Sequence, residues 1–253
     1  MNKDATQHAN ATLDAAEVER FSRMAAEWWD PTGKFRPLHQ IGPVRLSFIR
    51  DQLSAHFSLS PKSLRPFERL RLLDIGCGGG LICEPLARLG GSVVGIDPSE
   101  VNIQVARSHA EPQELHIDYR AMTVEALAAG GESFDAVICL EVVEHVPDVG
   151  AFLRSCAGLL APGGIMVLST INRTLKSFAL AIVGAEYVLR WLPVGTHQWD
   201  RFVRPDELDG HLRAAGLAMG PPRGMLYNPI ADRWSLGADT DVNYLASATY
   251  ARP

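Results

Sequence analysis

The chain has 253 residues, a net charge of −5, 47% hydrophobic residues and 21% charged residues. These values exclude a chain that is disordered throughout, which has fewer apolar residues and a larger net charge. They also argue against nucleic acid as a partner, because nucleic-acid binding favours a basic face. No run reaches the ~20 apolar residues that span a bilayer, and the polar N-terminus lacks a signal peptide's apolar core, so we expect a cytoplasmic protein.

The start of the chain predicts a tail followed by helices. Residues 1–13 are predicted to form a disordered tail, and residues 14–60 a helical lid whose second helix begins near Pro43. The lid either covers a bound ligand or docks on the edge of a sheet. Its first helix is predicted from the helical spacing of Val18, Phe21, Ala25 and Trp28.

Residues 61–250 alternate between short apolar strands and helices, which is typical of a doubly wound α/β fold. We expect a mostly parallel, seven-stranded sheet covered by helices on both faces. Residues 171–203 break the alternation and predict a cap insertion. The expected strands lie at 70–75, 92–97, 117–120, 134–139, 165–170, 226–228 and 242–245.

A glycine-rich turn follows the first of these strands and includes Asp74, Gly76 and Gly78. Glycine lets the backbone turn tightly and approach a ligand closely, and ligands of open α/β sheets lie at the carboxyl ends of the strands. A dinucleotide fingerprint needs glycine or alanine where Leu81 stands, and no Gly-Lys-Ser/Thr triplet follows. The turn therefore predicts a small-molecule site that is neither a dinucleotide site nor a nucleotide-hydrolase phosphate loop.

Asp97 ends the next expected strand, 23 residues after Asp74. A carboxylate in this position can accept hydrogen bonds from both hydroxyl groups of a ribose. Alternatively, the segment Asp97–Ser99 is only the cap of the helix that follows. The agreement in position of strand, glycine turn and acid favours ribose binding.

Four segments together resemble the class I S-adenosylmethionine-dependent methyltransferases: Leu73–Gly80, Val94–Asp97, Phe134–Val137 and Leu160–Gly164. A fuller set of segments resembles the family of ubiquinone-biosynthesis O-methyltransferases. The resemblance implies S-adenosyl-L-methionine as cofactor and O-methylation of polyprenyl phenols and catechols at two steps. The segments are Trp28–Asp30, Phe35–His39, Pro43–Leu46, Glu141–Asp148, Thr170–Arg173, Val183–Tyr187, Gly195–His197, Tyr227–Ile230 and Asp241–Tyr244.

The same resemblance implies a set of cofactor-binding residues. Arg45 offers a planar fork that can pair with the cofactor's carboxylate. Asp74 and Gly78 are expected to shape the loop, with Asp74 reaching the cofactor's amino group through water. Leu140 stands where such enzymes often have methionine, so only an apolar contact is expected there. The residues expected to line the cofactor site are Arg45, Gly76, Asp97 and Leu140.

Glu141, Glu144 and His145 form an acidic cluster with one imidazole just after the fourth expected strand. If this segment is helical, its spacing places Glu141 beside the other two. His145 can then act as general base toward a phenol, or the three side chains can bind a divalent cation, magnesium or zinc, that lowers the phenol pKa. A third interpretation is the start of a surface helix without a chemical role.

The apolar stretch Lys176–Trp199 predicts either a buried cap or a segment that lies in a lipid surface. The stretch 34–71 has eight Lys and Arg residues against two acids, which favours an anionic lipid surface as partner. We therefore expect peripheral association with the inner face of the membrane, where other ubiquinone-biosynthesis enzymes are potential partners. The alternative functions are methylation of another small phenol, a dinucleotide oxidoreductase, which Leu81 disfavours, and a non-catalytic membrane-surface protein, which the acidic cluster disfavours.

Overall fold

The computed structural model describes residues 12–60, 62–179 and 198–251. Most of the expected tail at 1–13 and the middle of the cap insertion at 171–203 lie outside the described residues. Among the described helices, none is long and apolar enough to cross a membrane.

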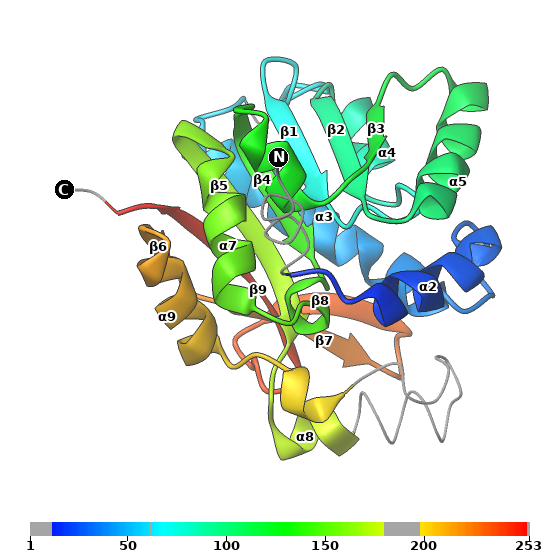
Figure 1. Ribbon diagram of the computed structural model, residues 1–253. Coiled ribbons are helices and arrows are strands. Elements are labelled where there is room, and N and C mark those ends of the chain that lie inside the picture. The colour runs from blue at the N-terminus through cyan, green and yellow to red at the C-terminus, as the bar shows by residue number, and fades with distance from the viewer. Residues whose placement is uncertain (1–11, 61, 180–197, 252–253) are drawn as a thin grey trace, which may run out of the picture.

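One sheet organises the described chain, with strand order β3-β2-β1-β4-β5-β9-β7-β8 and with β6 paired to β9 (Figure 1). The first five strands pair in parallel, and β9 joins β5 in the antiparallel direction. The strands are β1 (Arg71–Ile75), β2 (Ser92–Asp97), β3 (Asp118–Ala121), β4 (Phe134–Leu140), β5 (Leu160–Ile171), β6 (Leu217–Met219), β7 (Arg223–Asn228), β8 (Arg233–Gly237) and β9 (Asn243–Tyr250).

The expected α/β architecture is confirmed, but the expected number of strands is wrong. The described residues form nine strands instead of seven, and the two that were missed are β6 and β8. β6 has only three residues, and β8 lies at the edge of the sheet with no fully buried residue. Neither strand therefore has the continuous apolar run by which a central parallel strand is recognised.

Helices cover both faces of the sheet, so the parallel strands are apolar on both sides. On one face, Leu53, Leu86 and Ile103 are completely buried in one core cluster. On the other face, Leu153, Leu208 and Leu212 are completely buried in a second cluster. The first face carries α3 (Arg36–His56), α4 (Cys83–Arg88) and α5 (Glu100–Ala110), and the second carries α6 (Val124–Ala129), α7 (Val149–Gly158) and α9 (Pro205–Ala214).

The N-terminal segment folds differently from the expectation at one point. Its second helix, α3, begins at Arg36 and not near Pro43, which lies inside the helix. A proline in the first turn favours a helix start, and Pro37 supplies it. The hydrogen bond lost at Pro43 is offset by the buried face of α3, whose members include Val44 and Ile49.

From residue 12 onward, two short helices precede α3, namely α2 (Ala15–Arg23) and the 3₁₀ turn η1 (Ala25–Glu27). Asp14 caps α2 by accepting hydrogen bonds from the first-turn amides. In Figure 1 this segment lies across the lower ends of the parallel strands, which are their carboxyl ends. The described ends of the cap insertion contain α8 (Leu175–Ser177) and the 3₁₀ turn η5 (Trp199–Arg201).

Candidate active site

The candidate site lies at the carboxyl edge of the sheet. β1 pairs with β2 on one side and with β4 on the other, so the strand order reverses direction at β1. A crevice at such a switch point is where open α/β sheets bind ligands. The parallel register brings the ends of the three strands together, with Asp74 near the end of β1, Asp97 at the end of β2 and Leu140 at the end of β4.

The glycine turn lies directly beneath the lid. Gly78 has a φ of +52°, and a Cβ there would lie 2.4 Å from the ring of Trp28. Gly79 meets the same side chain, and its carbonyl accepts a hydrogen bond of 2.9 Å from Trp29 Nε1. These positions therefore require glycine for the approach of the lid's tryptophan, a reason that the sequence alone did not supply.

Asp97 holds the turn and the start of α5 together. Its carboxylate accepts hydrogen bonds from the backbone amides of Gly78 (3.1 Å) and Ser99 (2.8 Å) and from the amide group of Asn102 (3.2 Å). Burial raises the pKa of Asp97. The segment Asp97–Ser99 does cap α5, through Ser99, while Asp97 itself holds the glycine turn. A carboxylate has about four acceptor positions, which leaves room for a further donor.

Asp74 is buried between β1 and α4, and 3% of its surface is exposed. The thiol of Cys83 donates to its carboxylate at 3.2 Å. Burial raises the pKa of Asp74 to about 7, with a further contribution from the charge of Asp97. The carboxyl group therefore changes its charge near neutral pH.

Arg45 comes from α3, and its buried side chain lies 2.8 Å from Glu141, measured from Nη2 to Oε1. Ser169 Oγ donates to the same Glu141 oxygen at 2.6 Å. Glu141 has a φ of +55°, a conformation that is uncommon outside glycine and that occurs at functional sites. A ligand carboxylate that binds Arg45 would therefore compete with Glu141.

Glu141, Glu144 and His145 do not lie together on one helix, which is the arrangement that their spacing allowed. Only Val143–His145 form a turn, the 3₁₀ helix η3, and Glu141 precedes it with its left-handed backbone. Glu144 is buried and accepts a hydrogen bond of 2.9 Å from Thr170 Oγ1. Burial, with the charge of Glu141, raises the pKa of Glu144 well above its ordinary value.

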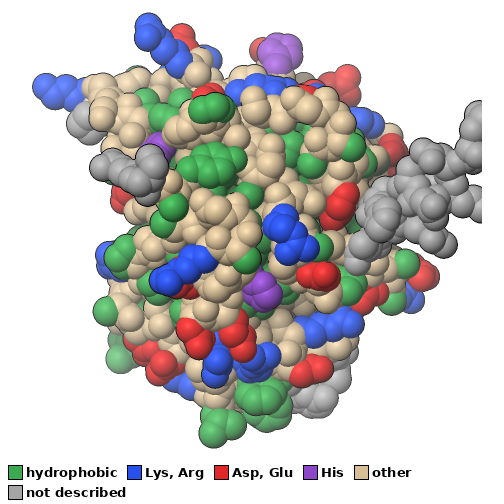
Figure 2. All heavy atoms as spheres, turned by 60° about the vertical axis from the view of Figure 1, so that its left-hand side comes forward, with side chains coloured by type: hydrophobic (Ala, Val, Ile, Leu, Met, Phe, Trp, Pro, Cys, Tyr) green, Lys and Arg blue, Asp and Glu red, His purple; other side chains and the backbone are tan. Residues whose placement is uncertain are grey.

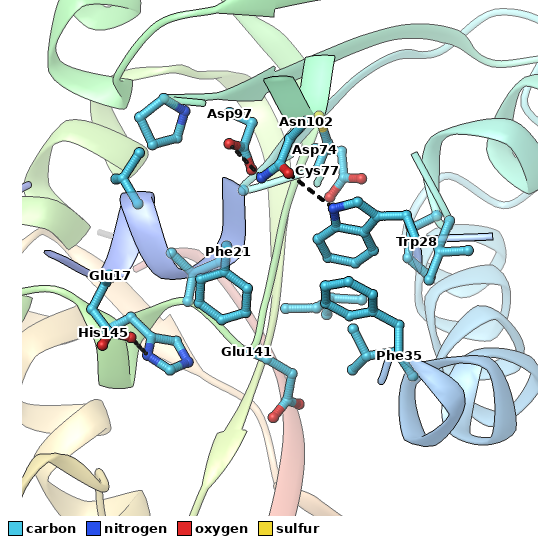
Figure 3. A pocket seen from close by; sticks show the side chains of 18 of the residues that line it. Glu17, Phe21, Trp28, Phe35, Asp74, Cys77, Asp97, Asn102, Glu141 and His145 are labelled. Carbon is cyan, nitrogen blue, oxygen red and sulfur yellow. Dashed lines mark hydrogen bonds and ion pairs between the residues drawn. The ribbon is translucent and has the colours of Figure 1, made fainter. Parts of the chain in front are cut away.

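His145 contacts the lid. Its Nδ1 lies 2.8 Å from Glu17 Oε2 on α2, and the ring of Phe21 packs against it edge to face at 5.5 Å between centroids (Figure 3). Burial works to raise the pKa of Glu17, but the hydrogen bond and charge of His145 outweigh it, so this pKa lies below its ordinary value. Glu17 is thus ionised at neutral pH.

Glu141, Glu144 and His145 bind three different partners: Arg45, Thr170 and Glu17. Over the described ranges, no three His, Cys, Asp or Glu side chains lie close enough to hold a metal ion. The expected ligand set is therefore present in the right region but is not assembled in this arrangement.

One cavity of about 250 Å³ connects these groups. Its lining includes all the predicted site residues except Gly78, which contributes through its hydrogen bond to Asp97. Figure 3 shows Asp97 and Asp74 on the side of the glycine turn, and Glu141 with His145 at the opposite end. The predicted residues that line it are Arg45, Asp74, Gly76, Asp97, Leu140, Glu141, Glu144 and His145.

Several site residues were missed from the sequence. Trp28 Nε1 donates to Asn102 at 3.0 Å, and so links the lid to the side chain that holds Asp97. Glu17 lies one helical turn before Phe21, on the face whose apolar spacing predicted the helix. The spacing could have placed Glu17 on the same helix face as Phe21, but it could not have identified His145 as its partner.

Comparison with known proteins agrees with this geometry. Residues 73–168 match the family described as a methyltransferase domain. The ubiquinone biosynthesis O-methyltransferase of Chelativorans sp. (strain BNC1) is 60% identical over 237 residues, with 94% of each chain covered. Its counterpart in Rhodopseudomonas palustris (strain BisB18) is 57% identical over 251 residues, covering 99% of this chain and 98% of the relative. The chain belongs to the ubiquinone biosynthesis O-methyltransferase family.

Solved structures support the fold of this family member. Magnesium protoporphyrin IX methyltransferase from Synechocystis PCC 6803 with bound SAH has a TM-score of 0.64 at 19% identity, covering 99% of this chain and all of the other. A possible histamine N-methyltransferase from Thermotoga maritima has a TM-score of 0.62 at 19% identity, covering 93% of this chain and all of the other. At such identities the likeness establishes the class I methyltransferase fold and not the substrate.

Asp97→Ala is expected to weaken cofactor binding. Each hydrogen bond to a charged group is worth about 1.5–3 kcal/mol, and each 1.4 kcal/mol is about tenfold in affinity. Calorimetric titration with S-adenosylhomocysteine should therefore show a loss of at least about tenfold. Asp118→Ala, which removes an exposed carboxylate on β3, is the control. Equal affinities in the two variants would contradict ribose binding by Asp97.

Asp74→Asn is expected to change how stability depends on pH. The pKa of Asp74 is about 7 in the folded chain against an ordinary 3.8. Between these values the folded chain holds a proton that the unfolded chain releases, so the free energy of unfolding falls as pH rises. Without cofactor, urea unfolding between about pH 4 and pH 7 should show a shallower fall for Asp74→Asn than for wild type.

The exposed Asp51→Asn on α3 controls for the change in net charge. It should follow the wild-type pH dependence. If Asp74→Asn follows it as well, the raised pKa of Asp74 is wrong.

Proposed function

We propose that the chain transfers a methyl group from S-adenosylmethionine to a hydroxyl group of polyprenyl phenols and catechols in ubiquinone biosynthesis. The observation that carries this proposal is one cavity that has Asp97 on the side of the glycine turn and His145 at the opposite end (Figure 3), and that Arg45, paired with Glu141, also lines. The names of relatives up to 60% identical support the same reaction.

S-adenosylmethionine, when bound, supplies a methyl group on a positively charged sulfur that an oxygen can displace in line. Asp97 would accept hydrogen bonds from the ribose hydroxyls, and Arg45 would pair with the amino-acid carboxylate after leaving Glu141. Asp74 and Glu144 are buried acids along the same cavity. Burial raises the pKa of both carboxyl groups, and a cationic ligand beside them would favour their ionised forms and lower both pKa values again.

At the other end, the chain must take a proton from the acceptor hydroxyl. His145 lines the cavity and can accept that proton as general base. The remaining catalytic effect comes from holding the oxygen in line with the methyl group and from excluding water. Phe21 from α2 and Leu140 from β4 supply apolar walls for this purpose.

A divalent cation in this cluster, one of the alternatives that its residue types offered, would need donors from Glu141, Glu144 and His145. Carboxylate and imidazole groups are suitable ligand types for magnesium or zinc. In the described arrangement they are held apart by separate partners, and Glu141 would have to leave Arg45. No step proposed here depends on a cation, and a chelator decides its role.

We also propose that the region around the cap insertion contacts a lipid surface. Leu175 is 81% exposed, and Phe178, three residues further along the chain, is exposed as well. Trp199 is also exposed, and a hydrogen bond from its Nε1 to Thr174 O holds it next to this segment. Figure 2 shows apolar side chains at the lower end of the molecule, the level at which α8 lies in Figure 1. Exposed apolar groups that gather in this way favour a lipid or protein surface.

The charges of this region favour apolar contact over attraction to anionic lipid. Lys176 pairs with Asp239 and with Asp241. At least half of the basic residues in the stretch 34–71 are likewise paired within the chain, among them Lys34, Arg45, Arg50 and Arg71. Part of the expected basic charge is thus neutralised.

His145→Ala is expected to lower turnover by about 10²–10⁴-fold, the usual contribution of a general acid or base, while affinity for S-adenosylhomocysteine stays within about twofold of wild type. The assay measures methyl transfer from labelled S-adenosylmethionine to a catechol with a short prenyl tail. His116→Ala changes an exposed histidine after α5 and is the control. A His145→Ala enzyme with wild-type turnover would contradict both proposed roles of His145, general base and metal ligand.

The same assay with a chelator separates these roles. Loss of wild-type activity that magnesium restores would assign His145 to a metal site, and indifference to the chelator would assign it as a metal-free base. A wild-type chain that binds S-adenosylhomocysteine but methylates no phenol would contradict the proposed function.

Leu175→Glu with Phe178→Glu is expected to reduce binding to phosphatidylglycerol vesicles by several-fold. Charged side chains cannot enter the acyl boundary, so the apolar contribution is lost. Sedimentation with vesicles measures the bound fraction. Leu64→Glu, which changes a leucine that is 89% exposed in the segment between α3 and β1, is the control. Wild-type protein that stays wholly in the supernatant would refute the lipid contact.

A further inference from the structure

We propose that Glu17 is a positioning residue for His145: the lid helix α2 supplies the carboxylate that fixes which ring nitrogen faces the reacting oxygen. This inference rests on the proposed role of His145 in the acceptor half of the cavity. It assigns a role to a lid residue that lies far from the cluster in the sequence.

The contact is short and sheltered. Glu17 Oε2 lies 2.8 Å from His145 Nδ1, and the two side chains are only 15% and 20% exposed. Because an ionised carboxylate can only accept, Nδ1 must carry the proton. In the neutral ring the second nitrogen, Nε2, is then the one without a proton, and Figure 3 shows it on the side of the ring away from Glu17.

Glu17 is itself held in place. Arg20 Nη2 lies 2.6 Å from the same carboxylate oxygen, one turn further along α2. The two ends of α2 are anchored as well: Asp14 pairs with Arg201 at 3.0 Å, and Ser22 Oγ lies 2.6 Å from Ser99 Oγ. A catalytic group is positioned accurately when its support is fixed in this way.

The pair has the same consequence under either role of His145. As general base, an unprotonated Nε2 accepts the phenol proton, and the Glu17 carboxylate stabilises the imidazolium that forms. As metal ligand, Nε2 binds the ion while the carboxylate holds Nδ1–H, an arrangement that fixes ring orientation. In both cases α2 must be docked before His145 is correctly oriented.

Glu17→Met keeps the length of the side chain but removes the acceptor, and Glu17→Gln keeps a neutral acceptor. We expect kcat to fall about 10–100-fold in Glu17→Met, the range for partners of this kind, and less in Glu17→Gln. KM for the catechol and affinity for S-adenosylhomocysteine should stay near wild type. Glu19→Gln, exposed on the same helix, is the matched control and should keep wild-type kcat.

Two further readouts distinguish positioning from a structural role. In the His145→Ala background, Glu17→Met should cause no further loss, because the two residues act as a unit. Nitrogen-15 spectra of the histidine rings, recorded without cofactor or substrate, should show a protonated Nδ1 on His145 in wild type and a shift of the proton to Nε2 in Glu17→Met.

The ring spectra need no turnover, so they separate this inference from the proposed function. A protonated Nδ1 in a wild-type chain that methylates nothing would leave the pair intact and refute the function. The inference is overturned if Glu17→Met keeps wild-type kcat, if it costs as much in the His145→Ala background as alone, or if the His145 spectrum is the same in both chains.

Discussion

The burial of acidic side chains at the carboxyl edge of a parallel sheet is the constraint on which the rest of the structure depends. Asp74, Asp97 and Glu144 are each less than a tenth exposed, and burial raises the pKa of all three. Such groups are tolerated where hydrogen bonds or opposite charges offset the loss of water. Arg45, together with the bonds around Asp97, supplies part of that compensation, and a cationic ligand in the cavity would supply more.

The N-terminal lid packs against the site at this carboxyl edge of the sheet. Trp28 covers the glycine turn and bonds to Asn102, which in turn holds Asp97, while Glu17 reaches His145 at the opposite end of the cavity. The same N-terminal segment therefore contacts both halves of the site. On the proposed function, the docking of this segment links the geometry of cofactor binding to the geometry of proton removal and would help to exclude water.

The sequence predicted the parts of the site whose signal is local. Strand, glycine turn and acid follow one another within a short stretch, so the cofactor edge around Asp97 could be located directly. Contacts between distant segments have no such signal, which is why the Glu17–His145 pair was missed. The left-handed backbone of Glu141 also escaped prediction, since spacing alone describes a regular helix. The edge strand β8 was missed because it is half exposed and has no continuous apolar run.

A crystal structure with S-adenosylhomocysteine and a short-tail catechol tests the central claim most directly, because it shows whether one cavity holds both reactants. The account predicts the ribose on Asp97, the amino-acid carboxylate on Arg45, and a catechol oxygen at the end of the cavity lined by Glu144 and His145. No chain atom should lie between that oxygen and the sulfur. A catechol bound outside the cavity, or a ribose away from Asp97, would contradict it.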